Sequence, residues 1–382
     1  MQLSTDPAAR RRLLALASAG ALALAVGIAV GSDSDTAPSE ERPVQARAAK
    51  QPVDALTLRR QIGQLLVSSF DGTTLPPYMR RRLRAGETAG VILFGGNAAT
   101  ASGWRSLTRG VQRAARGSAL VAVDQEGGEI RTVPFAGPEP GQPAQGSPAD
   151  VRALTRDAGS RLKTLGVNVN LAPVADVATA GAALGGRTFA GGPAEVAAST
   201  AAATAGLRAG GVAATAKHFP GLGAAAVNTD DGAVTIAAPR AVLEARELVP
   251  FRAAVRARVP LVMLSHALYP AMDGRRIASQ SPAVIAGLLR ERLGYRGVAV
   301  TDSLEAAAVL ARSGVAVAAE RSVRAGADLI LMTGSASWNE VFPRLLASAR
   351  RSPELRRRVR DSAARVLAMK RLVGLRSPAA AP

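Results

Sequence analysis

Seven short apolar segments recur along the chain, and apolar residues at helical spacing follow each of them. The segments are 90–94, 119–123, 167–171, 212–216, 261–264, 297–301 and 328–332. Continuous apolar runs of this length are typical of parallel strands that are covered on both faces. Strand–helix units repeated in this number predict an α/β fold, a single-domain TIM-type barrel. A doubly wound open sheet is the alternative, but the sequence has no G-x-G-x-x-G or P-loop motif.

The apolar spacing predicts helices over 56–70, 102–116, 148–165, 193–210, 239–257, 282–293, 305–325, 338–350 and 353–373. Polar residues follow nearly every apolar segment. In a barrel the carboxyl ends of the strands meet at one mouth, where active sites are built. We therefore expect the long stretches 128–148, 177–192 and 221–238 to be lids or active-site loops.

The first part of the chain has a different pattern. Three arginines, Arg10 to Arg12, precede an apolar run from Leu13 to Val30, and small residues follow. This predicts a signal peptide or membrane anchor over 1–31, and hence an exported protein that is secreted or held by that anchor. Residues 32–53 are polar and rich in Ser, Asp, Pro and Glu, which predicts a disordered linker. The barrel domain is expected over 54–375.

Composition narrows the classes of partner. The formal net charge is +19, which would suit nucleic acid, anionic lipid or an anionic polymer. Aromatic residues make up only 3% of the chain, which argues against stacking on bases, and no nucleic-acid partner is expected. We interpret most arginines as solvated helix faces, with electrostatic contact to anionic cell-wall polymers as a secondary expectation. The chain contains no cysteine, so disulfides, thiolate metal sites and a cysteine nucleophile are excluded.

The candidate chemistry lies at the predicted strand ends. The polar residues there are Asp124, Asp176, Lys217, His218, His266, Asp302 and Glu305, with Arg131 and Arg187 in the loops that follow. Two well-separated histidines make a metal site unexpected, and no cofactor is implied. Carboxylates beside a few cations suit glycoside hydrolysis. Two alternatives remain open, because Asp302 would also suit a helix N-cap and Lys217–His218 a purely structural pair at a strand end.

An ordered set of motifs resembles glycoside hydrolase family 3, in particular its single-domain bacterial β-N-acetylhexosaminidases. The motifs are Ala-Val-Asp124-Gln-Glu-Gly-Gly with Arg131, Ala172-Pro-Val-Ala-Asp176-Val, Gly-Gly-Arg187-Thr-Phe, Lys217-His218-Phe-Pro-Gly, Met-Leu-Ser-His266 and Val-Thr-Asp302-Ser-Leu. The resemblance runs from about Leu56 to Leu372. It implies a TIM-type barrel. We expect the protein to be a monomer.

The resemblance also implies an activity and roles for the site residues. The activity is retaining release of non-reducing β-linked N-acetylglucosamine from cell-wall muropeptides or related glycans. Asp302 would be the nucleophile. His266 would help to line the pocket, and the residues expected to bind the terminal sugar are Asp124, Arg131, Arg187, Lys217 and His218.

One loop departs from the family pattern. The family places a general acid/base histidine and an orienting aspartate after the Lys-His-Phe-Pro-Gly motif, whereas this chain has Asp230 and Asn228 at those positions. We hypothesise that Asp230 or Asp231 replaces the histidine as acid/base, because burial can raise the pKa of a carboxyl group far enough. The alternatives are a simple turn, a non-catalytic glycan-binding protein on the same fold, and a family 3 β-glycosidase of other sugar specificity.

Overall fold

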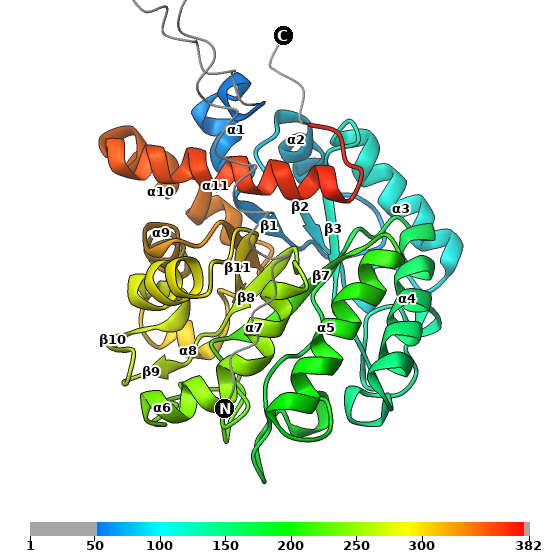
Figure 1. The fold of residues 1–382 in the computed structure, drawn as a ribbon. Coiled ribbons are helices and arrows are strands. Elements are labelled where there is room, and N and C mark those ends of the chain that lie inside the picture. The colour runs from blue at the N-terminus through cyan, green and yellow to red at the C-terminus, as the bar shows by residue number, and fades with distance from the viewer. Residues whose placement is uncertain (1–51, 378–382) are drawn as a thin grey trace, which may run out of the picture. The chain divides into compact units, whose positions relative to one another are not determined.

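The computed structural model describes residues 52–377, and their centre is a closed barrel of eight parallel strands (Figure 1). Around the barrel the order is β1-β12-β11-β8-β7-β6-β3-β2. The strands are β1 (Leu66–Ser68), β2 (Gly90–Ile92), β3 (Leu120–Val123), β6 (Val169–Asn170), β7 (Ala213–Phe219), β8 (Leu261–Leu264), β11 (Val298–Ser303) and β12 (Leu329–Met332). Helices surround this barrel, which confirms the TIM-type α/β fold predicted from the sequence.

The strand that the sequence analysis missed is β1. We predicted one helix over 56–70, but helix α1 (Leu58–Gly63) ends early and β1 follows it. Gly63 packs so closely on the backbone of Gly86 that a β-carbon there would lie 2.1 Å from its carbonyl oxygen. Residues 62–70 are buried without exception, so the segment has no polar face for solvent. A helix at this position would expose part of that apolar surface, whereas a barrel strand is covered on both sides.

The outer helices are α2 (Pro77–Ala85), α3 (Ala101–Ala114), α4 (Pro148–Thr164), α5 (Pro193–Ala209), α6 (Arg240–Val242), α7 (Leu248–Arg256), α8 (Ala307–Leu310), α9 (Val315–Ala325), α10 (Ser337–Arg351) and α11 (Pro353–Leu372). Helix α2 was not predicted. The helix predicted over 239–257 contains a π-helical segment, η6 (Leu243–Glu247), and that over 282–293 is the π-helix η8 (Ala283–Arg292). The helix predicted over 305–325 is two helices, because Gly314 begins α9 in an extended conformation.

Two short antiparallel strand pairs and several 3-10 turns complete the described fold. Strands β4 (Gln125–Gly127) and β5 (Ile130–Arg131) form one antiparallel pair, and β9 (Leu268–Tyr269) and β10 (Asp273–Ile277) form another. The 3-10 turns are η1 (Pro52–Ala55), η2 (Gly95–Asn97), η3 (Pro134–Ala136), η4 (Gln142–Ala144), η5 (Gly185–Arg187) and η7 (Ala278–Gln280).

Helix α11 closes the end of the barrel at which the strands begin. Val366, Met369 and Val373 pack into the same apolar cluster as inward-facing strand residues such as Leu261 and Val298. Each fully buried side chain of this kind stabilises the fold by about 1.5–3 kcal/mol. The mouth at the other end of the barrel is therefore the one left open for a ligand.

A buried carboxylate ties α11 to this closed end. Asp328 precedes β12 and is fully buried. It accepts hydrogen bonds from the guanidinium groups of Arg290 and Arg358 and from the backbone N–H of Ala299, and Arg365 lies 3.3 Å away. Because Arg358 and Arg365 belong to α11, Arg290 to η8 and Ala299 to β11, one buried carboxylate holds three elements together.

The predicted domain limits need one adjustment. Val53 is only 1% exposed and lies in η1, so residues 52 and 53 belong to the globular unit rather than to the predicted linker over 32–53. The predicted leader over 1–31 and the rest of that linker lie outside the described residues. Within residues 52–377, no helix is both long and apolar enough to cross a bilayer.

Candidate active site

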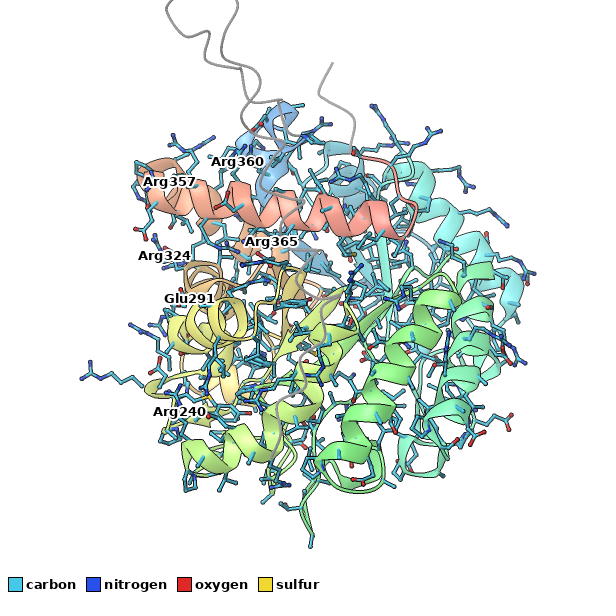
Figure 2. The ribbon with its side chains drawn as sticks, in the orientation of Figure 1. Arg240, Glu291, Arg324, Arg357, Arg360 and Arg365 are labelled. Carbon is cyan, nitrogen blue, oxygen red and sulfur yellow. The ribbon has the colours of Figure 1, made fainter. Side chains whose placement is uncertain are left out.

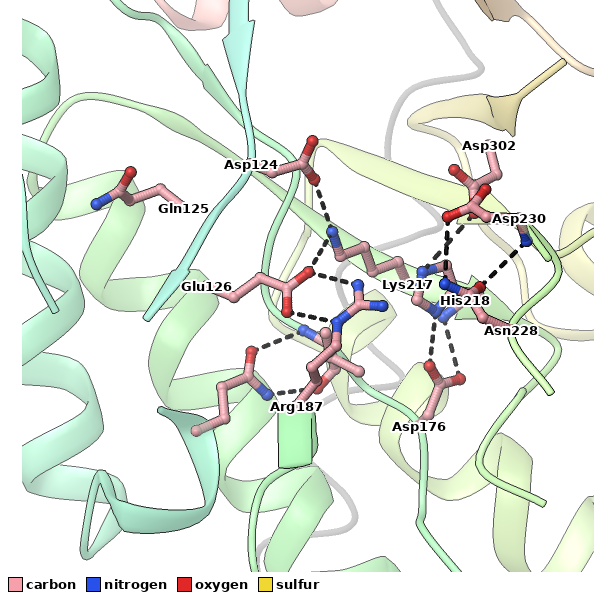
Figure 3. Close-up of polar contacts among 12 residues, drawn as sticks. Asp124, Gln125, Glu126, Asp176, Arg187, Lys217, His218, Asn228, Asp230 and Asp302 are labelled. Atoms are coloured by element: carbon pink, nitrogen blue, oxygen red, sulfur yellow. Dashed lines mark hydrogen bonds and ion pairs between the residues drawn. The ribbon is translucent and has the colours of Figure 1, made fainter. Parts of the chain in front are cut away.

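Polar side chains from several strand ends converge on one cavity of about 570 Å³ at the open mouth (Figure 3). Its lining includes Asp124, Arg131, Arg187, Lys217, His218, Asp230 and Asp302, all of which the sequence analysis named. Apolar side chains from neighbouring strands, Met263 and Leu331, form part of the wall. The structure thus brings seven sequence-predicted residues together, although they come from widely separated parts of the chain.

Lys217 and His218 lie within β7, not after it. We predicted that this strand ends at Ala216, but it continues to Phe219 with a register shift against β8 between Ala216 and Phe219. Both side chains are nearly buried, which would be costly without charged partners. Carboxylates from neighbouring segments supply those partners. Strand β7 can therefore continue beyond its apolar residues, which is why the apolar pattern predicted too short a strand.

Lys217 lies between two carboxylates. Its Nζ is 2.8 Å from Oδ1 of Asp124 and 2.7 Å from Oε1 of Glu126. Burial alone would lower the pKa of Lys217, but Asp124 and Glu126 outweigh it and raise the pKa above its usual value. The ammonium group is therefore a permanent positive charge in the cavity wall.

Glu126 links Lys217 to a second cation and is the residue that sequence reasoning overlooked. Arg187 binds it through two hydrogen bonds, Nε to Oε2 at 2.9 Å and Nη2 to Oε1 at 2.7 Å. Burial would raise the pKa of Glu126, but Lys217 and Arg187 hold it at about 2. A signal was present in the sequence, because positions 124 and 126 share one face of an extended segment.

A second buried carboxylate orients His218. Asp176 is fully buried, and its Oδ2 lies 2.7 Å from Nδ1 of His218. Its Oδ1 accepts the backbone N–H groups of His218 and Leu222, at 3.1 and 2.7 Å. These contacts leave Nε2 of His218 pointing into the cavity, 3.8 Å from Oδ2 of Asp302.

Asp302 lies near the end of β11 with its side chain 19% exposed. Burial would raise its pKa, but the neighbouring His218, His266 and Lys217 lower it below the ordinary value. Its Oδ1 accepts the N–H of Ser303 at 2.8 Å, and the next helix, α8, starts only at Ala307. The N-cap alternative for Asp302 is therefore wrong, because no helix begins beside it.

His266 lies behind the cavity rather than on its wall. It is fully buried, with Nδ1 2.8 Å from Oγ of Ser279 and Nε2 2.9 Å from the carbonyl oxygen of Ser303. Burial lowers the pKa of His266, although the negative charge of Asp302 opposes this shift. Its Nε2 holds the backbone next to Asp302, which differs from the pocket-lining position expected from the resemblance.

The atypical loop places Asp230 in the cavity. The residue is exposed overall, but its carboxyl lies on the cavity wall beside Asp302 (Figure 3). Partial burial and the negative charge of Asp302 raise the pKa of Asp230. The amide of Asn228 donates to Oδ2 of Asp230 at 3.2 Å. Asp231 is exposed and does not line the cavity.

Two backbone contacts anchor this loop to α8. The N–H of Ala307 donates to the carbonyl of Asp230 at 3.2 Å, and that of Ala308 donates to Thr229 at 3.1 Å. Because α8 directly follows β11, these bonds hold Asp230 at a set position relative to Asp302. The spacing of the sequence alone did not distinguish Asp230 from Asp231.

Arg131 has its guanidinium at the rim, where Nε donates to the carbonyl of Gly128 at 2.8 Å and Nη1 to that of Pro134 at 3.3 Å. Glu305, another strand-end residue, instead anchors the next strand by accepting the N–H of Thr333 at 2.8 Å. Among the described residues, no group of three or more His, Asp or Glu side chains is arranged to hold a metal ion.

Comparisons with known proteins agree with this geometry. Residues 57–369 match the sequence profile of the glycosyl hydrolase family 3 N terminal domain. A β-hexosaminidase of Xanthomonas oryzae is 32% identical over 278 residues, which cover 70% of this chain and 83% of that protein.

Two solved structures are similar over most of the chain. A family 3 β-N-acetylglucosaminidase of a Paenibacillus species aligns with a TM-score of 0.80 and 33% identity. The alignment covers 86% of this chain and 64% of that one, slightly less than two thirds of its length. A β-N-acetylhexosaminidase of Beutenbergia cavernae aligns with a TM-score of 0.77 and 31% identity, covering 82% and 98%. With its barrel, its convergent site and its match over 57–369, the chain belongs to glycosyl hydrolase family 3 and is a glycoside hydrolase.

Proposed function

We propose that this glycoside hydrolase releases terminal β-linked N-acetylglucosamine with retention of configuration, using Asp302 as nucleophile and Asp230 as acid/base. The observation that carries the proposal is the pair of carboxyl groups in one cavity with pKa values shifted in opposite directions, that of Asp302 lowered and that of Asp230 raised. Titratable groups driven apart in this way mark the acid and the base of an active site.

In the first step Oδ2 of Asp302 attacks the anomeric carbon as the glycosidic C–O bond breaks. The proton on the carboxyl of Asp230 passes to the departing oxygen, which leaves as an alcohol. In the second step Asp230, now a carboxylate, takes a proton from water while the water oxygen attacks the anomeric carbon and displaces Asp302. Two displacements at one carbon return the original configuration.

The polar groups around the nucleophile suit a sugar. Asp124 and His218 present an acceptor and a ring nitrogen to hydroxyl groups, and Arg187 and Arg131 add donors at the cavity wall. Because Glu126 and Asp176 hold Lys217, Arg187 and His218 in place, little order is lost when a sugar binds. The names of the relatives support N-acetylglucosamine as the sugar removed. Cell-wall muropeptides or related glycans are the proposed source, which accords with the export predicted from the leader.

The test compares two substrates with different leaving groups. A nitrophenyl β-N-acetylglucosaminide has a leaving group that needs no protonation, whereas N,N′-diacetylchitobiose needs it. We expect Asp302→Asn to lose activity on both substrates. Asp230→Asn should lose about 10²–10⁴-fold on the disaccharide, the usual contribution of general acid catalysis, and much less in the glycosylation step of the aryl substrate. Azide should restore turnover of the aryl substrate by Asp230→Asn and give the β-glycosyl azide.

Asp231→Asn is the matched control, because Asp231 is the adjacent carboxylate and lies outside the cavity lining. It should keep activity on both substrates. An Asp230→Asn variant that hydrolyses the disaccharide at the normal rate would refute the assignment of the acid. If the unmodified protein binds N-acetylglucosamine but turns over neither substrate, the alternative of a non-catalytic glycan-binding protein replaces the proposal. Turnover of other aryl glycosides in preference would favour a β-glycosidase of different specificity.

A further inference from the structure

A second cavity lies at the closed end of the barrel, opposite the active site. It has a volume of about 660 Å³ and is formed by the loops that precede β8 and β11 and by the last two turns of α11. We call it the basal groove. Its apolar floor includes Val259 and Met369, and its cations are Arg258, Arg296, Arg365 and Arg371.

Most arginines of the basal groove have no acidic side chain to balance their charge among the described residues. Arg258, Arg296 and Arg371 are exposed, and none of them forms an ion pair with an acidic side chain among residues 52–377. Only Arg365 has such a partner, the buried Asp328 at 3.3 Å. Three unpaired guanidinium groups around one apolar cavity are arranged to receive an anion.

The surroundings of the groove extend its positive charge. In a barrel the outer helices end where the strands begin, so the basic residues of their last turns gather at the closed end. These include Arg113, Arg161, Arg208 and Arg256, whereas Arg292 and Arg324, also in last turns, are paired with Glu244 and Glu320. Favourable interaction with helix dipoles explains the position of each one. Figure 2 labels Arg324 and Arg365 on one side of the molecule, together with the acidic Glu291.

The groove also offers apolar contact, which distinguishes a lipid surface from a soluble polyanion. Leu372 lies at its edge and is 75% exposed, the highest value among the exposed large apolar side chains of the described residues. A soluble polyanion offers negative charge to the arginines but no acyl chains to the apolar residues. Arginines next to an exposed leucine and an apolar floor are instead the combination by which proteins contact anionic bilayers, with cations on headgroups and the apolar side chain at the acyl boundary.

The chain enters the barrel next to this groove. Pro52 and Val53 share a small cavity with Arg365, Ala368 and Arg371 of α11. The sequence predicts an apolar leader that ends at Val30, and the chain from there to Pro52 can span at most about 75 Å. A bilayer that holds the leader is thus within reach of the basal groove.

We propose that the basal groove docks the protein on an anionic phospholipid surface. Lipid phosphate would lie among Arg258, Arg296 and Arg371, and Leu372 would enter the acyl boundary. In this orientation the active-site mouth, at the opposite end of the barrel, faces away from the bilayer toward soluble or polymeric glycan. The inference does not depend on the chemistry proposed for Asp230 and Asp302.

The test uses the full chain, and the absence of cysteine allows a single label at a chosen position. Leu372→Cys carries an environment-sensitive fluorophore at the groove, and Phe135→Cys carries it on a loop at the other end, where Phe135 is 43% exposed. With vesicles of phosphatidylglycerol and phosphatidylcholine, the label at 372 should shift to the blue and the label at 135 should not. With phosphatidylcholine alone, the label at 372 should shift much less.

A charge-matched pair of variants tests the arginines. Arg258→Glu/Arg296→Glu/Arg371→Glu should weaken partition onto anionic vesicles at least about tenfold, since each basic residue near such a surface adds measurable affinity. Arg80→Glu/Arg105→Glu/Arg152→Glu has the same change in net charge in the first halves of α2, α3 and α4 and should weaken it less. Arg371→Gln alone should give a smaller loss. Circular dichroism and aryl-substrate hydrolysis check that the variants fold.

Three outcomes would overturn the proposal. Equal losses in the two triple variants would mean that only net charge attracts the protein. A blue shift at 135 rather than 372 would place the wrong face on the bilayer. Binding of soluble polyphosphate that is lost in the groove variant, without any binding to vesicles, would identify an anionic polymer such as a wall polymer as the partner.

Discussion

Glu126→Gln is the substitution that most directly tests the electrostatic basis of the site. The side chain is 3% exposed and accepts hydrogen bonds from Arg187 while Lys217 lies 2.7 Å away. Its pKa is about 2 in the folded protein, against an ordinary value of 4.5. That difference of about 2.5 units corresponds to roughly 3 kcal/mol of folding free energy at neutral pH. We expect Glu126→Gln to lower the free energy of unfolding by about this amount.

The same difference fixes the pH dependence. A carboxyl group whose pKa is lower in the folded state stabilises the fold fully above its unfolded pKa and loses this contribution as pH falls toward the folded value. The gap between wild type and Glu126→Gln should therefore be constant from pH 7 to about 5, and should shrink by about 1.4 kcal/mol per unit between pH 4.5 and 2. Urea denaturation monitored by circular dichroism at pH 7, 5 and 3.5 measures it.

Glu87→Gln is the control, because Glu87 pairs with Arg59 at the surface, where that arginine is 49% exposed. Exposed pairs contribute about 0–1 kcal/mol, so this variant should lose little. Glu126→Gln should also raise the KM for the aryl substrate, since Lys217 and Arg187 lose their common anchor. A loss as small as that of Glu87→Gln, or one that does not change between pH 5 and 3.5, would refute the reasoning.

Two further substitutions test buried groups outside the cavity. Burial lowers the pKa of Lys370 to about 7, and its Nζ donates to Gln64 at 2.7 Å. The free energy of unfolding should therefore rise by about 2.3 kcal/mol between pH 7 and 9 from this residue, and Lys370→Met should abolish that rise in urea titrations. Burial also raises the pKa of Glu247 to about 7, and one of its carboxylate oxygens has no hydrogen-bond partner. The charged form of Glu247 therefore destabilises the fold, but only above its unfolded pKa, where the carboxyl group would otherwise be ionised. Glu247→Gln should accordingly raise the melting temperature at pH 8 but not at pH 4.5. Equal effects of Glu247→Gln at both pH values would contradict this assignment.

The sequence predicted the barrel because its strands are short, wholly apolar and separated by amphipathic helices. The predicted bounds of the elements were wrong where that pattern is interrupted. The apolar run before Phe70 also fits a helix, and only the close packing of Gly63 on Gly86 shows why α1 ends there. Strand β7 extends past its apolar residues, because the buried carboxylates of Glu126 and Asp176 compensate Lys217 and His218.

The candidate site was predictable as a set of strand ends but not as a network. Spacing along the chain does not reveal that Glu126 joins Lys217 to Arg187, since the three residues come from different loops and strands. Nor does it distinguish Asp230 from Asp231, because that depends on the contacts of the loop with Ala307 and Ala308. His266 was placed in the pocket by resemblance, whereas its hydrogen bonds to Ser279 and Ser303 hold it behind Asp302.

The proposed use of a carboxyl group in place of an imidazole as acid/base would change what the rest of the site must supply. An imidazole has an ordinary pKa near 6.5, whereas an aspartate has one near 3.9 and is deprotonated at neutral pH unless its surroundings raise the pKa. Here partial burial raises the pKa of Asp230, and the negative charge of Asp302 adds to that rise. In the proposed mechanism Asp302 becomes an ester in the glycosyl-enzyme, so that its charge would disappear and the pKa of Asp230 would fall. Asp230 would then be a carboxylate at the step that needs a base, so one nearby charge can set both of its proposed roles.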